Sequence, residues 1–302
     1  MASSPISQCK PKSGRHGGLG DLERLFRVSD QNTFPHPDIV FISIDLEVSR
    51  EERARTMVKT DHIPHIKELG FAWMDSRQIF SAAPLQSRNK EAKTSSVSTR
   101  QFSTSSASKD FEDCDVTNFQ ECIFAETFRV APEDIPATVI RCLQFRDELS
   151  VEPNALRNVA IVGHSPGCDI KLIQRLGVDI CSTCPVIAVL DTYLLSRYIL
   201  GNTSTKPSPT KFSLGAILQE MQCPHNYWEL HNAGNDATYT LHVLVSLVLR
   251  WAERKEPTAD TLFNVDCLKA FLNFELHESP RWEPVRCALG AHWSKDENAE
   301  QD

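Results

Sequence analysis

The chain has 302 residues, of which 41% are hydrophobic and 24% charged, a balance typical of soluble globular proteins. Its net charge of −8 excludes a general electrostatic attraction to polyanions, so nucleic-acid binding would need a local basic surface or a metal bridge to phosphate. No apolar run approaches the ~20 residues of a membrane span, and no apolar segment of a secretory signal follows Met1. The ten cysteines are therefore expected to be free thiols in an intracellular protein, cytoplasmic or nuclear.

Composition predicts three parts along the chain. Residues 1–36 are rich in Ser, Pro and Gly and are expected to be disordered, apart from a short amphipathic piece at 22–26. Residues 37–256 carry the apolar segments of one domain, interrupted at about 82–113 by a Ser- and Thr-rich stretch that predicts a flexible insert. Residues 257–302 are expected to form a C-terminal extension with an acidic tail.

The first strong pattern is the apolar run at residues 39–44, which ends on Asp45 and Glu47. The run predicts a buried central strand, and residues two apart in a strand point to the same face. Two neighbouring carboxylates beside apolar surface repel each other and lose solvation. A hard divalent cation such as Mg²⁺ is the usual partner for such a pair.

The remaining elements predict an α/β sheet of mixed strand direction. Further strands are expected at 68–75 and 122–128, and a helix after Pro132. From Asn158 a strand, turn and helix pattern repeats, with strands at NVAIVGH and VIAVLDT and helices at CDIKLIQRLG, YLLSRYILG, SLGAILQEM and 236–251.

Three further residues fall where such a sheet would bring them together. Asp169 begins a helix just after the NVAIVGH strand, Asp236 opens the long helix, and His231 lies five residues before it. Active sites of open α/β sheets collect at strand ends and adjoining helix starts. The carboxylates would there hold two divalent metals, and the imidazole would take a proton from water.

Three motifs in this order resemble the signature of DEDDh-type 3′→5′ exonucleases of the ribonuclease-H-like superfamily. They are Asp45-x-Glu47, then Gly163-His164 with Asp169, then His231-x₄-Asp236. The strings LHNAGNDATYTL and KELGFAWMD, and LDT around Asp191, are similar to fungal members. The resemblance covers roughly residues 37–252.

The resemblance implies a ribonuclease-H-like mixed sheet of five strands, the first three antiparallel and the first central, with helices on both faces. It implies that Asp45, Glu47, Asp169 and Asp236 hold two Mg²⁺ or Mn²⁺ ions and that His231 is the general base. The substrate would be single-stranded RNA or DNA, and the products would be nucleoside 5′-monophosphates.

The second motif departs from the family pattern. Where the family usually has an Asn and an aromatic residue before the Asp, this chain has Ser165 and Cys168. Neither change removes a metal ligand, but both bear on substrate handling. The alternative function is therefore a catalytically weak or inactive adaptor associated with nucleic acid.

A rival interpretation is a serine esterase, because GHSPG matches the nucleophile elbow G-x-S-x-G between a strand and a helix. Ser165 would be the nucleophile, followed by Asp191 and His231. Pro166 counts against it, because the oxyanion hole needs an N–H that proline lacks. Asp191 is instead expected to be structural.

Two further patterns resemble metal-binding sites, but a role without metal is favoured for each. Cys181-x-x-Cys184 would need Cys223 and His225 to complete a zinc site, and structural or incidental thiols are favoured. Asp61-His62-x-x-His65 stands in a polar linker, where a solvated segment is favoured.

Overall fold

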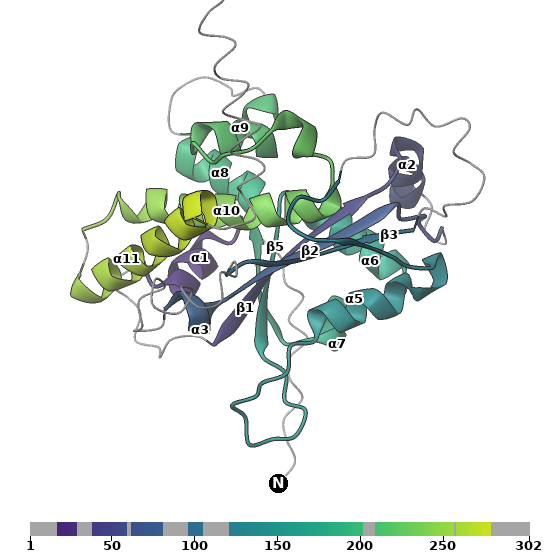
Figure 1. The fold of residues 1–302 in the computed structure, drawn as a ribbon, viewed down its shortest axis with the longest axis horizontal. Helices are drawn as coiled ribbons and strands as arrows, with labels where there is room; N and C mark the ends of the chain where they lie inside the picture. The colour runs from purple at the N-terminus through teal and green to yellow at the C-terminus, as the bar shows by residue number, and fades with distance from the viewer. Residues whose placement is uncertain are drawn as a thin grey trace, which may run out of the picture.

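A six-stranded sheet forms the centre of the molecule, with helices on both faces (Figure 1). The computed structural model describes residues 17–28, 38–58, 62–80, 96–104, 121–201, 209–256 and 258–278. The strands follow the order β4-β3-β2-β1-β5-β6 across the sheet. Their bounds are β1 Ile39–Glu47, β2 Glu68–Asp75, β3 Ser98–Ser103, β4 Thr127–Arg129, β5 Asn158–Gly163 and β6 Val186–Asp191.

Strand directions agree with the expected ribonuclease-H-like sheet. β1 pairs antiparallel with β2, and β2 pairs antiparallel with β3. On the other side β5 runs parallel to β1, and β6 parallel to β5. The predicted antiparallel start and central first strand are confirmed. The sheet has one strand more than the five expected, because β4 adds to the edge, parallel to β3.

The prediction of the third strand was wrong. It was placed at residues 122–128, of which only Thr127 and Phe128 are in a strand. The third strand is β3, inside the stretch expected to be a flexible insert. Two of its polar side chains bond to distant parts of the fold: Thr99 Oγ1 lies 2.8 Å from Thr238 Oγ1, and Gln101 donates to Glu68. Residues 81–95 and 105–120 of this region lie outside the described residues.

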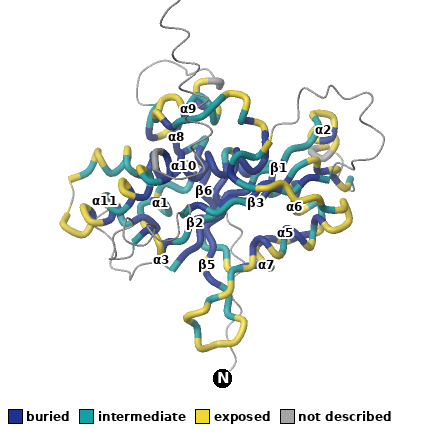
Figure 2. Tube along the Cα trace, in the orientation of Figure 1, coloured by how far each residue is buried: buried dark blue, intermediate teal, exposed yellow. Residues whose placement is uncertain are grey.

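Alternation along β1 divides the core into two layers. Ile39 and Phe41 pack on one face, whereas Val40, Ile42 and Ile44 pack on the other. The first face is covered by α10 (Ala233–Ala252), whose buried length crosses the sheet in Figures 1 and 2. Around α10 lie α1 Leu19–Phe26, α8 Thr192–Leu200, α9 Leu214–Glu220 and α11 Ala259–Asn273. The second face is covered by α5 Ile135–Leu143, α6 Gly167–Arg175 and α7 Ile180–Thr183.

Short elements complete the chain between these helices. They are α2 Arg50–Val58, α3 Ser76–Ile79, the 3₁₀ turns η3 Pro132–Asp134, η4 Pro209–Phe212 and η5 Tyr227–Glu229, and the π-helical turn η6 Phe274–Glu278. Among the described helices, none has both the length and the apolar character needed to cross a membrane.

Parts of both expected tails belong to the core. α1 was noted only as an amphipathic piece in a disordered region, yet Leu22, Leu25 and Phe26 are fully buried. The Phe26 ring stacks on Phe41 of β1 with centroids 4.6 Å apart. At the other end α11 packs on α10 and α3. Residues 1–16, 29–37 and 279–302 lie outside the described residues.

Candidate active site

The site begins where β1 ends beneath the start of α10. Asp45 and Glu47 follow Phe41 on the same face of β1, the face that α10 covers. Across the sheet Asp45 is opposite Gly70, and Glu47 is opposite Glu68. A Cβ at Gly70 would lie 2.0 Å from the carbonyl oxygen of Ala233, so only glycine lets the first turn of α10 approach the sheet this closely.

The start of α10 is built from local hydrogen bonds. Asn232 caps the helix by accepting from the N–H of Asn235 at 3.1 Å. His231 has the left-handed φ of 68°, and its N–H donates to Asp236 Oδ2 at 3.1 Å. This turn places Asp236 in the first helical turn, where the helix dipole favours a negative charge, and leaves the His231 side chain exposed.

Glu68 ties this turn to the sheet. Its Oε2 atom accepts a hydrogen bond from the N–H of Ala233 at 3.2 Å and another from Gln101 Nε2 at 2.9 Å. Glu68 is not among the site residues predicted from the sequence. The available signal was an acidic residue at the start of the strand that follows the first motif.

The structure brings the five expected residues to this end of the sheet. Ligand atoms of Glu47, His231 and Asp236 all lie within 4.8 Å of one another. Asp169 lies in the first turn of α6 and is almost completely buried. The charges of Asp169, Asp236 and Glu47 all act on Asp45. Asp45 and Asp169 thus interact with the other residues through their charges, and the short distances within 4.8 Å join only Glu47, His231 and Asp236 among the described residues.

Burial and mutual repulsion raise the pKa of every one of these carboxyl groups. The pKa of Asp45 lies well above its usual range, first because of desolvation and then because of Asp169 and Asp236. Desolvation is also the main cause that raises the pKa of Glu47 to about 7, of Asp169 to about 7 and of Asp236 to about 8. The guanidinium of Arg53 on α2 opposes the increase at Asp45, Glu47 and Asp169.

The donor set fits divalent cations. Asp45 Oδ2 and Asp236 Oδ1 are buried oxygens that accept no hydrogen bond from the described residues. A buried carboxylate oxygen without a partner is costly unless a proton or a cation occupies its lone pairs. Hard carboxylate oxygens are the ligands that Mg²⁺ and Mn²⁺ prefer.

The His62 and His65 pattern has a different role from metal binding. Glu52 of α2 accepts from the backbone N–H of His65 at 2.8 Å and is hydrogen-bonded to the His62 ring. These contacts fasten α2 to the segment before β2. Arg53 follows Glu52 and reaches the Leu46 carbonyl at 3.4 Å. Asp61 lies outside the described residues.

The esterase interpretation is not supported by the geometry. The N–H of Ser165 donates to Asp191 Oδ1 at 3.2 Å, and Asp191 also caps α8 by accepting from Tyr193 and Leu194. Asp191 is therefore occupied by backbone groups, which agrees with the structural role expected for it. Pro166 offers no N–H for an oxyanion.

The zinc interpretation is also not supported. Cys184 packs in the hydrophobic layer on the α6 face, whereas Cys223 packs in the layer on the α10 face. The sheet separates the two thiols. Cys223 is near Ser246, and His225 bonds the carbonyl of Cys223 rather than pointing to a cysteine pair.

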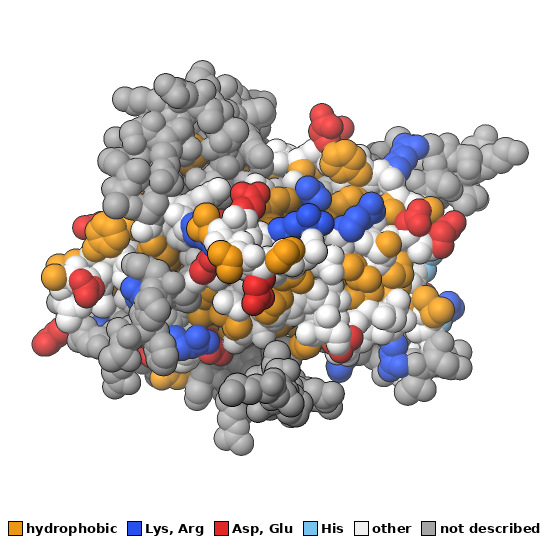
Figure 3. Space-filling view, turned by 90° about the horizontal axis from the view of Figure 1, so that it is seen from below, with side chains coloured by type: hydrophobic (Ala, Val, Ile, Leu, Met, Phe, Trp, Pro, Cys, Tyr) orange, Lys and Arg blue, Asp and Glu red, His pale blue; other side chains and the backbone are white. Residues whose placement is uncertain are grey.

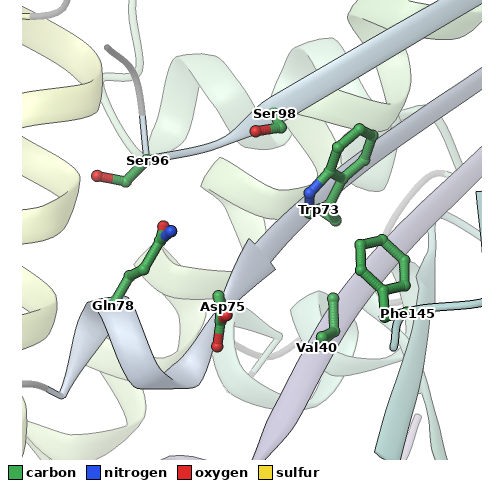
Figure 4. Close-up of a pocket in the computed structure, with 7 residues that line it drawn as sticks. All are labelled: Val40, Trp73, Asp75, Gln78, Ser96, Ser98 and Phe145. Carbon is green, nitrogen blue, oxygen red and sulfur yellow. The ribbon is translucent and has the colours of Figure 1, made fainter. Parts of the chain in front are cut away.

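One small pocket, of about 80 Å³, lies at the other end of the sheet (Figure 4). Its wall includes Val40 and Asp75, which are paired in register at the end of β1 away from Glu47. Trp73 and Phe145 form the apolar side, with ring centroids 5.6 Å apart. The volume holds only a few waters, so the pocket is not the candidate active site.

Comparisons with known proteins agree with this arrangement. The sequence model of a DEDDh family described as DNA polymerase III subunit epsilon-like, C-terminal domain, matches residues 40–247. Uncharacterized protein YDR514C of Saccharomyces cerevisiae (strain ATCC 204508 / S288c) is 28% identical over 149 residues, 44% of this chain and 29% of that protein. Good for full DBP5 activity protein 2 of the same strain is 32% identical over 103 residues, 28% of this chain and 17% of that protein.

The chain thus spans less than a third of the length of either curated relative. The family match is broader, because it covers more than half of the chain and runs from β1 through most of α10. It includes Asp45, Glu47, Asp169, His231 and Asp236. This chain belongs to the DEDDh family of DNA polymerase III subunit epsilon-like domains.

Proposed function

We propose that this protein is a metal-dependent 3′→5′ exonuclease, which hydrolyses the terminal phosphodiester of single-stranded RNA or DNA to nucleoside 5′-monophosphates. The observation that carries the proposal is the convergence of four carboxylates and an exposed imidazole from three distant segments. The family is of the exonuclease type, which supports nuclease chemistry at this place.

Each residue has a role in the proposal. Asp45, Glu47, Asp169 and Asp236 would hold two divalent cations, which supply Lewis-acid activation of water and neutralise the developing charge. His231 would accept the proton of the attacking water, because its ring is exposed beside Glu47 and Asp236. The hydrogen bond from its backbone to Asp236 fixes the turn from which the ring extends.

Local positive charge supports binding of a phosphate backbone by this acidic chain. Arg53 and Lys67 lie close enough to Glu47 for their positive charges to lower its pKa, against the increase that burial and Glu68 cause. Figure 3 also shows a short group of Lys and Arg side chains in the upper middle of the face, with acidic side chains around it. Such groups contact phosphates without any need for a positive net charge on the whole chain.

The test is degradation of a 5′-labelled single-stranded RNA and its DNA counterpart in Mg²⁺ or Mn²⁺. A ladder that shortens from the 3′ end, and that EDTA and Asp45→Ala both abolish, supports the exonuclease and reports which sugar is preferred. Intact substrate after incubation with folded, metal-loaded protein refutes it and leaves the adaptor function.

A further inference from the structure

Two large aromatic rings stand exposed beside the candidate active site. Tyr227 and Trp228 are 69% and 68% exposed, although aromatic side chains of this size normally bury most of their surface. They are adjacent on η5, with ring centroids 5.9 Å apart and planes at 82°. An exposed pair of this kind is a candidate contact surface for a ligand or partner.

The turn that carries the rings is held by several hydrogen bonds. The Asn226 and Glu229 side chains form a capping box, in which Trp228 N–H donates to Asn226 and Asn226 N–H donates to Glu229 at 2.9 Å. Tyr239 of α10 donates its hydroxyl to the same Glu229 carboxylate at 2.5 Å. Asn235 of α10 donates to the Glu229 carbonyl at 2.9 Å. The backbone that carries the rings is therefore held on α10, so a bound ligand would have to order little beyond the two side chains.

The pair lies close to the candidate active site along the chain. Trp228 precedes His231 by three residues, so their Cα atoms are at most about 11 Å apart. Leu230 between them is buried and fixes the path of the chain. Asn235, whose side chain braces the turn, also donates its backbone N–H to the Asn232 cap at the helix start that carries Asp236. A strand end placed at the carboxylates would bring its last few nucleotides within reach of the rings.

We propose that Tyr227 and Trp228 form a stacking platform for unpaired nucleobases at the 3′ end of the substrate. This inference rests on the proposed function and makes it narrower, since it selects strands whose terminal bases are free to stack. Every base has a π-face, so the platform is tolerant of sequence. Because the planes of the two rings are nearly perpendicular, one base cannot stack on both, and the rings engage different bases. Stacking also provides affinity that does not depend on positive charge, which suits a chain of net charge −8.

The test compares an oligonucleotide with normal bases and one whose last three nucleotides are abasic. Both carry phosphorothioate linkages at the 3′ end to slow hydrolysis, and binding is measured by fluorescence anisotropy in Mg²⁺. We expect the parent protein to bind the normal strand roughly tenfold more tightly than the abasic strand. Trp228→Ala should lose most of this preference, Tyr227→Ala part of it, and Trp228→Phe little.

The matched control is Phe263→Ala. Phe263 is 46% exposed on α11, which packs against α3 at the end of β2 remote from Glu68. It should keep the full preference for the normal strand. Equal binding of both strands by the parent, or an unchanged preference in both alanine variants, would overturn the platform. Degradation of ordinary single strands by the same parent preparation is scored separately, so the platform can fail while the exonuclease stands.

Discussion

Replacing Glu47 with Gln should make the metal-free protein more stable and the enzyme inactive. Glutamine keeps the shape of the side chain but removes the charge that burial and Glu68 disfavour. The folded-state pKa is about 7, against an ordinary 4.5, so the folded protein holds the proton of Glu47 to higher pH than the unfolded chain. The destabilisation caused by the charge of Glu47 is absent below about pH 4.5, grows as the pH rises toward 7 and is constant above pH 7.

The difference between 4.5 and about 7 corresponds to about 3 kcal/mol at most, and partial exposure of Glu47 reduces the expected gain to about 2 kcal/mol. For a chain of 302 residues that gain raises the melting temperature at pH 8 by about 3 °C. The assay is thermal unfolding in EDTA at pH 8 and pH 4.5, with activity in Mg²⁺ measured in parallel. Activity should fall at least ~100-fold, since the change removes a proposed metal ligand.

Glu51→Gln is the matched control on α2. Hydrogen bonds from its own backbone N–H and from Ser49 lower the pKa of this exposed carboxyl group, so neutralising it should not stabilise the protein. If Glu47→Gln gives no gain at pH 8, or a gain of equal size at pH 4.5, charge repulsion at the site is not what the substitution relieves, and the electrostatic reasoning is wrong.

Three further predictions concern residues around the cluster. Arg53→Gln should weaken oligonucleotide binding about tenfold in an anisotropy titration. Arg55 is exposed on the same helix, and Arg55→Gln should leave binding unchanged. Equal effects of the two substitutions would mean that only net charge matters. Glu68→Ala leaves the Ala233 N–H without the carboxylate that accepts its hydrogen bond. The single-turnover rate of strand cleavage should fall roughly 10–100-fold, while the affinity for the oligonucleotide stays unchanged. An unchanged rate would contradict the positioning role of Glu68. Phe26→Ala should destabilise the protein by about 3–5 kcal/mol in urea unfolding, and a loss below about 1 kcal/mol would show that α1 is not part of the core.

Sequence predicted best the elements whose pattern is apolar and regular. β1, β5 and β6 are buried between two helical layers, and their Val- and Ile-rich runs identify them without knowledge of the fold. β3 was missed because its buried Gln101 and Ser103 are polar and depend on partners far away in sequence, such as Glu68. The charged residues of α2 do not by themselves predict a packed helix, because its anchoring rests on Glu52 and the later His65.

The residues of the candidate site likewise fall into those that the sequence predicts and those that only the structure reveals. Asp45, Glu47, Asp169, His231 and Asp236 follow from motifs that each stand at an element boundary. Arg53 and Glu68 carry no motif, and their contribution depends on strand register and on the path of α2. The aromatic pair on η5 was overlooked because a sequence does not tell exposed rings from buried ones.

The contact of the N-terminal segment with β6 has a consequence for how this domain responds to proteolysis. The Gly17 carbonyl accepts from the N–H of Asp191, and the Asp191 carboxylate holds the N–H of Ser165, two residues before α6 begins. A protease that cut between α1 and β1 would therefore weaken, through this short series of bonds, the support of the helix that carries Asp169. Limited digestion could thus reduce activity while leaving the sheet and every proposed ligand intact.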